Sequence, residues 1–200
     1  MRCQLAWGKD EPLPDDPGLA DRVFMAAAQP DLLHPIHIRH VATTTRAVLW
    51  VQSAVSQAFA RNAPCVIVAD IYPKSGALTR ELLYETAANA IVATVSGAHL
   101  EGVGTADGAL PNCSRLEARW MGEVGRAVAR QNLTLLEAKA LALRLLEKYE
   151  HVFSQSSGNP GRRFDEVYDL ETLQPVPAWK QMYRQVKAEV RALGLAALEE

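Results

Sequence analysis

The chain has 200 residues, of which 48% are hydrophobic and 22% charged, a composition typical of globular proteins. Its 21 Lys and Arg against 23 Asp and Glu give a net charge of −2, which excludes a generally basic nucleic-acid-binding surface and an acidic solvating tail. Three cysteines without a CxxC pair argue against a disulfide framework and a structural zinc site. With no apolar run of membrane-spanning length and no signal peptide, we expect a cytoplasmic protein that binds neither membrane nor nucleic acid.

Residues 1–18 contain three prolines and clustered acidic side chains, which predicts an irregular, exposed leader. We expect residues 19–200 to form one α/β unit. Its first elements alternate between helix and strand, with helices over 20–29, 43–62 and 78–95 and strands over 35–39, 65–70 and 99–104. The continuous apolar run at 65–70 predicts a strand covered on both faces. The alternation indicates βαβ units and therefore a parallel sheet.

Helices dominate the second half of the sequence. Capping boxes at 114–117 and 134–137 predict two helix starts, separated by a break at Asn132, and Pro177 predicts the first residue of a final amphipathic helix. Gly122 and Gly125 each cost a helix about 1 kcal/mol relative to Ala, so we expect another element to approach closely there. About three strands cannot close a (β/α)8 barrel. The chain is thus either a small open sheet or part of something larger.

The segment 35–39 contains the first candidate site. In a strand, Ile36 and Ile38 face one way while His37 and Arg39 face the other. A buried Arg needs an anionic partner, so two polar groups on an inward face suggest a site, whereas a solvated sheet edge is the structural alternative. Arg46 in the first turn of the next helix opposes the helix dipole, which indicates either a specific acidic partner or an ordinary surface residue.

Other candidates follow the next strands. Asp70 ends the apolar strand, where parallel folds place their chemistry, or it caps a turn. His99 and Glu101 share a face and could act as an acid–base pair, while no third ligand stands at a spacing that would complete a metal site. Glu117 and Arg119 are explained by the capping box and by an i,i+4 ion pair, and are also candidate substrate- or partner-binding residues.

Several blocks between residues 33 and 194 together resemble one known family, the pyrrolysine-containing monomethylamine methyltransferases of methylotrophic methanogens. The matching blocks are PIHIR at 35–39, TTTR at 43–46, LEGVGTA at 100–106, LEARWMGEV at 116–124, LEKY at 146–149 and FDEVYD at 164–169. At 68–73 the sequence departs from the family, which carries an amide side chain there, followed by a cysteine-rich stretch.

The resemblance implies the C-terminal portion of a TIM-like (β/α)8 barrel, with parallel strands and trailing helices. It implies transfer of the methyl group of methylamine to the cobalt of a partner corrinoid protein, with no cofactor bound directly by this chain. The family's pyrrolysine lies upstream of everything in this sequence, so the chain is expected to lack the reactive half. We expect the catalytic candidates to line the barrel mouth, and Arg46 to sit at its rim: His37, Arg39, Asp70, His99 and Glu101.

Two alternatives to this enzyme remain open. A partial barrel would expose a sheet edge and apolar helix stripes, which predicts a non-catalytic chain that associates with itself or with a missing N-terminal half. The other alternative is a small α/β enzyme that uses His99 and Glu101 as an acid–base pair.

Overall fold

The computed structural model describes residues 32–33, 35–62, 66–108, 110–154 and 159–199. Its elements, in chain order, are β1 (Leu32–Leu33), α2 (Arg46–Asn62), β2 (Val68–Ile71), α3 (Arg80–Val95), β3 (His99–Val103), η1 (Ala106–Gly108), α4 (Arg115–Gln131), α5 (Leu135–Tyr149), η2 (Glu150–Ser154), α6 (Phe164–Val167), β4 (Tyr168–Asp169), β5 (Gln174–Pro175) and α7 (Pro177–Ala192). The expected leader at 1–18 and helix at 20–29 lie outside the described residues. None of the described helices is long and apolar enough to span a bilayer.

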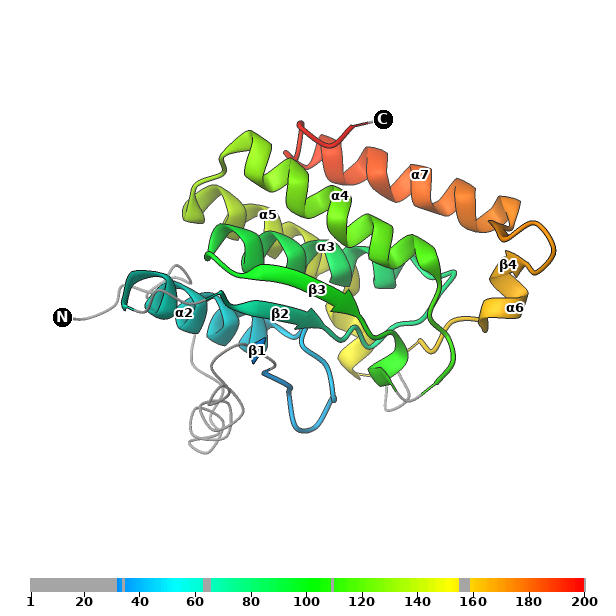
Figure 1. Cartoon of the computed structure of the whole chain (residues 1–200), viewed down its shortest axis with the longest axis horizontal. Coiled ribbons are helices and arrows are strands. Elements are labelled where there is room, and N and C mark those ends of the chain that lie inside the picture. The colour runs from blue at the N-terminus through cyan, green and yellow to red at the C-terminus, as the bar shows by residue number, and fades with distance from the viewer. Residues whose placement is uncertain (1–31, 34, 63–65, 109, 155–158, 200) are drawn as a thin grey trace.

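The sheet is parallel, as the alternating pattern predicts. Its strands lie in the order β1-β2-β3, with Leu32 opposite Val68 and Val68 opposite His99. Consecutive strands are therefore neighbours, each pair joined by a helix (Figure 1). The chain is an α/β protein with parallel strands.

The helices α2 and α3 pack on the same face of β2. Ile67 and Ala69 are buried against Val55 and Phe59 of α2 and against Ala93 of α3. In a doubly wound sheet, by contrast, successive helices cover opposite faces. The sheet is thus covered by the described helices on one face.

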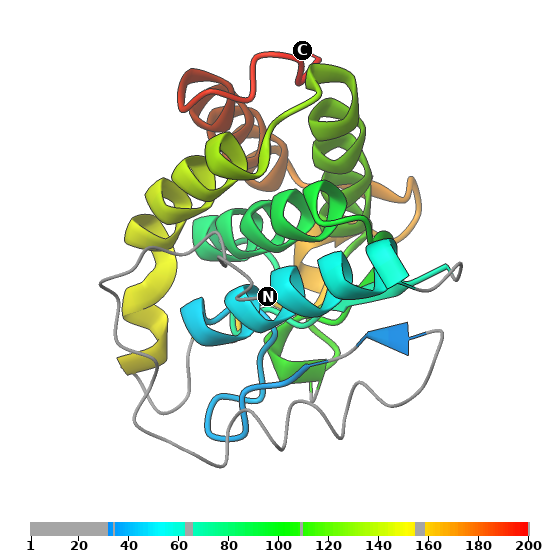
Figure 2. The same ribbon diagram turned by 90° about the vertical axis from the view of Figure 1, so that its left-hand side faces the viewer.

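Helix α3 is the centre of the helical layer. All twelve residues from Leu82 to Ala93 are buried, so the helix has no solvent face. It lies between α4 and α5, which Figure 2 shows on either side of it. The indole Nε1 of Trp120 on α4 donates to the Leu83 carbonyl at 2.7 Å, which satisfies the one polar atom of that buried ring.

The local helix signals are confirmed. Ser114 with Glu117 and Thr134 with Glu137 form complete capping boxes, and Asn132 ends α4 in the left-handed conformation with φ of 52°. Gly97 follows α3 with φ of 93°, and Pro177 is the first residue of α7. Each of these signals depends on residues within one helical turn, so tertiary contacts do not change the helix ends that they predict.

The predicted strand at 35–39 is wrong. The strand of this region is β1, and the chain turns at 38–41, with an isolated antiparallel bridge between His37 and Ala42. The His37 amide donates to the Ala42 carbonyl at 3.0 Å, and Val41 adopts a positive φ of 50°. The alternating isoleucines resemble a strand, yet Ile38 is 60% exposed because the turn directs it to solvent.

The expectation that 65–70 is covered on both faces is also wrong for its described residues, 66–70. Buried Ile67, Ala69 and Ile71 alternate with half-buried Val68 and Asp70, as in a strand with one covered face. A Cβ added to Gly125 of α4 would lie 2.6 Å from Leu100 Cδ1, which confirms the close approach of another element. At Gly122 the expectation is wrong, since no described atom lies within 4 Å of an added Cβ.

The described chain also contains elements that the sequence pattern does not predict. The strands β4 and β5 form a two-residue antiparallel pair, with Tyr168 opposite Pro175. Together with α6, this pair lies beside the first turns of α4 and α7 (Figure 1). The end of the molecule toward which β2 and β3 point is therefore lined by loops and by helix starts.

Candidate functional site

The carboxyl ends of β2 and β3 meet at one edge of the sheet, called the carboxyl edge below. Asp70 is the third residue of β2 and Glu101 the third of β3. Ala69 pairs with Leu100 but Ile71 pairs with Val103, so two residues of β3 lie opposite the single Asp70. Such a bulge re-aims side chains and is common beside active sites.

The bulge places Asp70 over a glycine. One carboxylate oxygen of Asp70 lies 3.6 Å from the position that a Cβ of Gly102 would occupy. This distance is an ordinary van der Waals contact. The Asp70 carboxylate therefore lies next to a β3 residue that has no side chain.

Tyr72 lies beside the two carboxylates at this edge. Its ring packs over two glycines, since a Cβ on Gly104 or Gly108 would lie 2.9 or 2.8 Å from the Tyr72 ring carbon Cε1. The pKa of the Tyr72 phenol is raised, first by the negative charge of Asp70, then by partial burial and by Glu101. The three groups are thus close enough to interact electrostatically.

A buried carboxyl group lies behind the carboxyl edge. Glu85 of α3 is fully buried and accepts hydrogen bonds from Thr44 Oγ1 at 2.5 Å, from the Lys74 amide at 2.7 Å and from the Ser75 amide at 3.1 Å. Burial raises the Glu85 pKa to about 7, although these hydrogen bonds oppose the rise. The side chain joins the segment before α2 to the loop that follows β2.

A second buried network fixes the backbone at Tyr72. Asn89 donates from Nδ2 to the Thr43 carbonyl and hydroxyl oxygens, at 3.0 and 3.1 Å, and accepts from Gln52 Nε2 at 3.1 Å. The Thr43 amide in turn donates to the Tyr72 carbonyl at 2.9 Å, and the Tyr72 amide donates to Thr43 Oγ1 at 2.8 Å. The carboxyl edge is therefore held by a network that leaves its backbone little freedom.

Helix α5 supports the same region from behind. The hydroxyl of buried Tyr149 donates to the Thr44 carbonyl at 2.7 Å. The Arg46 guanidinium donates to both carboxylate oxygens of Glu150, at 3.0 and 2.9 Å. The acidic partner that the position of Arg46 suggests therefore lies within the chain, 104 residues away, and stabilises the start of α2.

The structure brings together only some of the predicted site residues. Asp70 and Glu101 lie opposite each other at the carboxyl edge. His37 forms the bridge to Ala42 and Arg39 lies in the turn at 38–41, so neither lies in a strand, and that they line a barrel mouth stays a prediction. His99 is the first residue of β3, because the strand begins there, and it lies at the amino end of the strand instead of at the mouth.

Glu117 and Arg119 have structural partners. Glu117 is 1% exposed and accepts hydrogen bonds from the Ser114 amide and hydroxyl, and burial raises its pKa to about 7 against the effect of these bonds. Arg119 donates from Nε to Glu123 at 2.6 Å. Their capping and i,i+4 explanations are confirmed.

Sequence reasoning did not identify Tyr72, Glu85 or Asn89. A signal for the last two is present in the sequence: they are polar residues at i and i+4 within an otherwise apolar helix pattern, which places them on one buried face. Tyr72 carried no such signal, because its position depends on two glycines in the segment that follows β3.

Comparisons with known proteins agree with this architecture. A sequence profile described as monomethylamine methyltransferase MtmB matches residues 17–195. A monomethylamine methyltransferase of Methanosarcina barkeri is 31% identical over 175 residues, which cover 86% of this chain and 37% of the relative. The corresponding protein of Methanosarcina mazei is 31% identical over 173 residues, with the same coverage of both chains. This chain therefore spans little more than a third of the length of these relatives.

Solved structures give the same result. The crystal structure of the Methanosarcina barkeri monomethylamine methyltransferase superposes with a TM-score of 0.76 at 29% identity, covering 82% of this chain and 35% of that one. A structure described as its hydroxylamine complex matches equally well. Since the profile match extends over most of the sequence, the chain belongs to the monomethylamine methyltransferase MtmB family.

Proposed function

We propose that this chain forms the C-terminal part of the wall of a (β/α)8 barrel that transfers the methyl group of monomethylamine to the cobalt of a corrinoid protein. Family membership supports the reaction, and the fold supports the barrel. Neighbouring strands in sequential order, with helices on one face, are the arrangement of a barrel wall. We also propose a cytoplasmic location.

The acidic carboxyl edge is the observation that carries this proposal. Methylamine is a cation at neutral pH, and the carboxylates of Asp70 and Glu101 would favour a cation at the end of the sheet where barrel enzymes bind substrate. We assign to Asp70 and Glu101 the attraction and orientation of the ammonium group. A fixed orientation contributes to rate because it removes rotational freedom before the reaction.

The reaction itself needs groups beyond those described here. The carbon–nitrogen bond of methylamine breaks, the nitrogen keeps the electron pair and leaves as ammonia, and the methyl group passes to reduced cobalt. Among the described residues, no three His, Cys, Asp or Glu side chains are grouped to hold a metal ion. We assign the corrinoid to a partner protein. Because the 200 residues are all standard amino acids, we assign the pyrrolysine that the family carries to the remaining barrel wall, within a longer polypeptide or a separate one.

Methylammonium binding to the 200-residue chain tests the role of the edge. Chemical-shift titration should show saturable binding that is lost in the double variant Asp70→Asn/Glu101→Gln. The matched control Glu147→Gln/Glu171→Gln removes two exposed carboxylates elsewhere and should leave binding unchanged. Equal binding in all three proteins would contradict the assignment.

The face of the sheet that the described helices leave uncovered supports association with further barrel wall. Val66 is 59% exposed beside half-buried Val68 on the face away from α2 and α3. We infer that a second polypeptide, either another copy or the rest of a barrel, covers this face. Light scattering at increasing concentration should show a mass above that of the 21.9 kDa chain if another copy covers the face, whereas a monomer at all concentrations would exclude another copy.

A further inference from the structure

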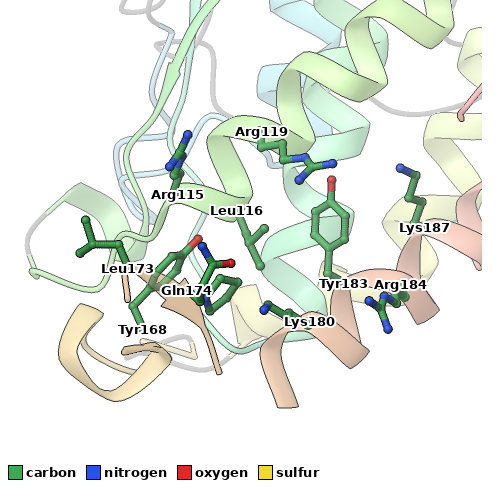
Figure 3. A pocket seen from close by; sticks show the side chains of 11 residues that line it. Arg115, Leu116, Arg119, Tyr168, Leu173, Gln174, Lys180, Tyr183, Arg184 and Lys187 are labelled. Atoms are coloured by element: carbon green, nitrogen blue, oxygen red, sulfur yellow. The ribbon is translucent and has the colours of Figure 1, made fainter. Parts of the chain in front are cut away.

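A hollow lies outside the sheet, between α4, α7 and the β4–β5 pair, and is called the basic pocket below. Its volume is about 430 Å³, within the range of roughly 300–1,000 Å³ typical of small-ligand sites. In the sequence, α5, η2 and α6 separate α4 from the β4–β5 pair, whereas β5 and α7 follow each other directly (Figure 3). The basic pocket does not include Asp70, Tyr72 or Glu101.

The lining of the basic pocket is strongly cationic. Five of its residues are Lys or Arg and none is Asp or Glu, in a chain whose net charge is −2. The five are Arg115, Arg119, Lys180, Arg184 and Lys187. A basic protein surface would collect such residues by chance, but this chain has more acidic than basic side chains.

One carboxylate next to the basic pocket balances part of this charge. Glu123 accepts from Arg119 at 2.6 Å, from Lys187 Nζ at 2.7 Å and from the Tyr183 hydroxyl at 2.7 Å. Burial alone would raise its pKa, but hydrogen bonds from Lys187, Tyr183 and Arg119 lower it, so Glu123 is ionised at neutral pH. Five cations against one carboxylate leave an excess of four positive charges.

The remaining three cations have no carboxylate partner within the described part of the chain. Arg115, Lys180 and Arg184 take part in none of the ion pairs found there. The amides at the start of α4 are not available to bind an anion, because Ser114 and Glu117 already cap them. The affinity of the basic pocket for an anion therefore comes from these side chains.

We propose that the basic pocket binds a small ligand that carries phosphate groups. Guanidinium groups match phosphate oxygens in pairs, and an ammonium group adds a compact positive charge beside them. The hydroxyl of Tyr168 and the amide of Gln174 line the same hollow and supply further polar groups. A ligand with two or more negative charges would balance the excess that Glu123 leaves.

Calorimetric titration of the 200-residue chain with inorganic pyrophosphate, at constant ionic strength, tests the proposal. We expect saturable binding that weakens roughly tenfold or more in the double variant Arg115→Gln/Lys180→Gln. The matched control Arg126→Gln/Lys139→Gln also removes one Arg from α4 and one Lys from another helix, neither of which lines the basic pocket, and should bind like the parent chain. Far-ultraviolet circular dichroism checks that both variants are folded.

Two further probes identify the source of the phosphate. Tighter binding of ADP than of pyrophosphate would assign the basic pocket to a nucleotide, and the reverse to a free polyphosphate; both results support a phosphate ligand. Citrate, which has a similar charge without phosphate, should bind at least about tenfold more weakly. Absence of saturable binding for any phosphate probe, equal binding of citrate, or equal loss in the control variant would overturn the proposal. None of these results depends on methylamine chemistry.

Discussion

The carboxyl edge and the basic pocket carry opposite charges and are built by different means. At the edge, Asp70 and Glu101 project from strand backbone that buried side chains of α3 hold in place. At the basic pocket, cations project from the faces of α4 and α7 around the single carboxylate Glu123. The edge therefore depends on a network beneath it, whereas the basic pocket depends on how two helices pack. The predictions below separate these two dependences.

The largest effect is expected beneath the carboxyl edge. Glu85→Ala leaves the Thr44 hydroxyl and the amides of Lys74 and Ser75 without their acceptor in a dry interior, and should lower the free energy of unfolding by about 3–5 kcal/mol. Urea denaturation measures the loss. The control Glu147→Ala, on the exposed side of α5, should change stability by less than about 0.5 kcal/mol. A similar small change for both variants would mean that the network does not hold the edge.

A smaller loss is expected at the basic pocket. Glu123→Ala removes the acceptor of Lys187, whose side chain is 9% exposed, and should cost about 1–3 kcal/mol. The same variant raises the positive charge of the pocket, so pyrophosphate should bind more tightly while the protein becomes less stable. Calorimetry measures the pyrophosphate affinity, which should rise, and urea denaturation of the same sample measures the stability, which should fall. Weaker pyrophosphate binding would show that Glu123 organises the pocket instead of balancing its charge.

The pH dependence of stability tests the raised pKa values of two buried glutamates, Glu85 beneath the carboxyl edge and Glu117 at the start of α4. The pKa of Glu85 and of Glu117 is raised from 4.5 to about 7 by burial, so the folded state holds protons that the unfolded state has released. Stability should therefore fall as pH rises from about 4.5 to 7 and level off above, with a slope of at most about 1.4 kcal/mol per pH unit for each group. In Glu117→Gln, which can still cap α4, urea denaturation at several pH values should show a shallower slope. An unchanged slope would contradict the raised pKa of Glu117.

The smallest effect concerns the helix shared by both regions. Gly125→Ala would bring a Cβ against Leu100 of the sheet and should destabilise the protein by about 1 kcal/mol. Gly122→Ala, one turn earlier, meets no described atom and should stabilise α4 by up to about 1 kcal/mol. Thermal unfolding of the two variants should thus shift in opposite directions. Shifts of the same sign would mean that α4 packs on β3 less tightly than the contact indicates.

The sequence predicts the features that are decided locally. Capping boxes, the left-handed Asn132 and the N-terminal Pro177 of α7 depend on neighbours within about one turn, so they could be read directly. The parallel sheet followed from the alternation of elements. The strand assigned to 35–39 failed because alternating isoleucines do not show that Val41 will adopt a positive φ.

The candidate sites are less predictable because they join distant segments. Asp70 and Glu101 could be selected as residues of parallel strands, but the bulge that sets them opposite each other depends on strand register. The Arg46–Glu150 pair spans 104 residues, and the basic pocket joins two helices to the β4–β5 pair, which no pattern indicated. Such contacts are decided by tertiary packing, which no local spacing encodes.

The enclosed helix α3 has a consequence for how the protein opens. Its amide protons lie beneath α2, α4 and α5 and cannot reach solvent until those neighbours separate. Hydrogen–deuterium exchange in α3 should therefore be the slowest in the described chain and should report the loss of the whole layer at once. A ligand held in the basic pocket would slow that exchange even though it touches no atom of α3.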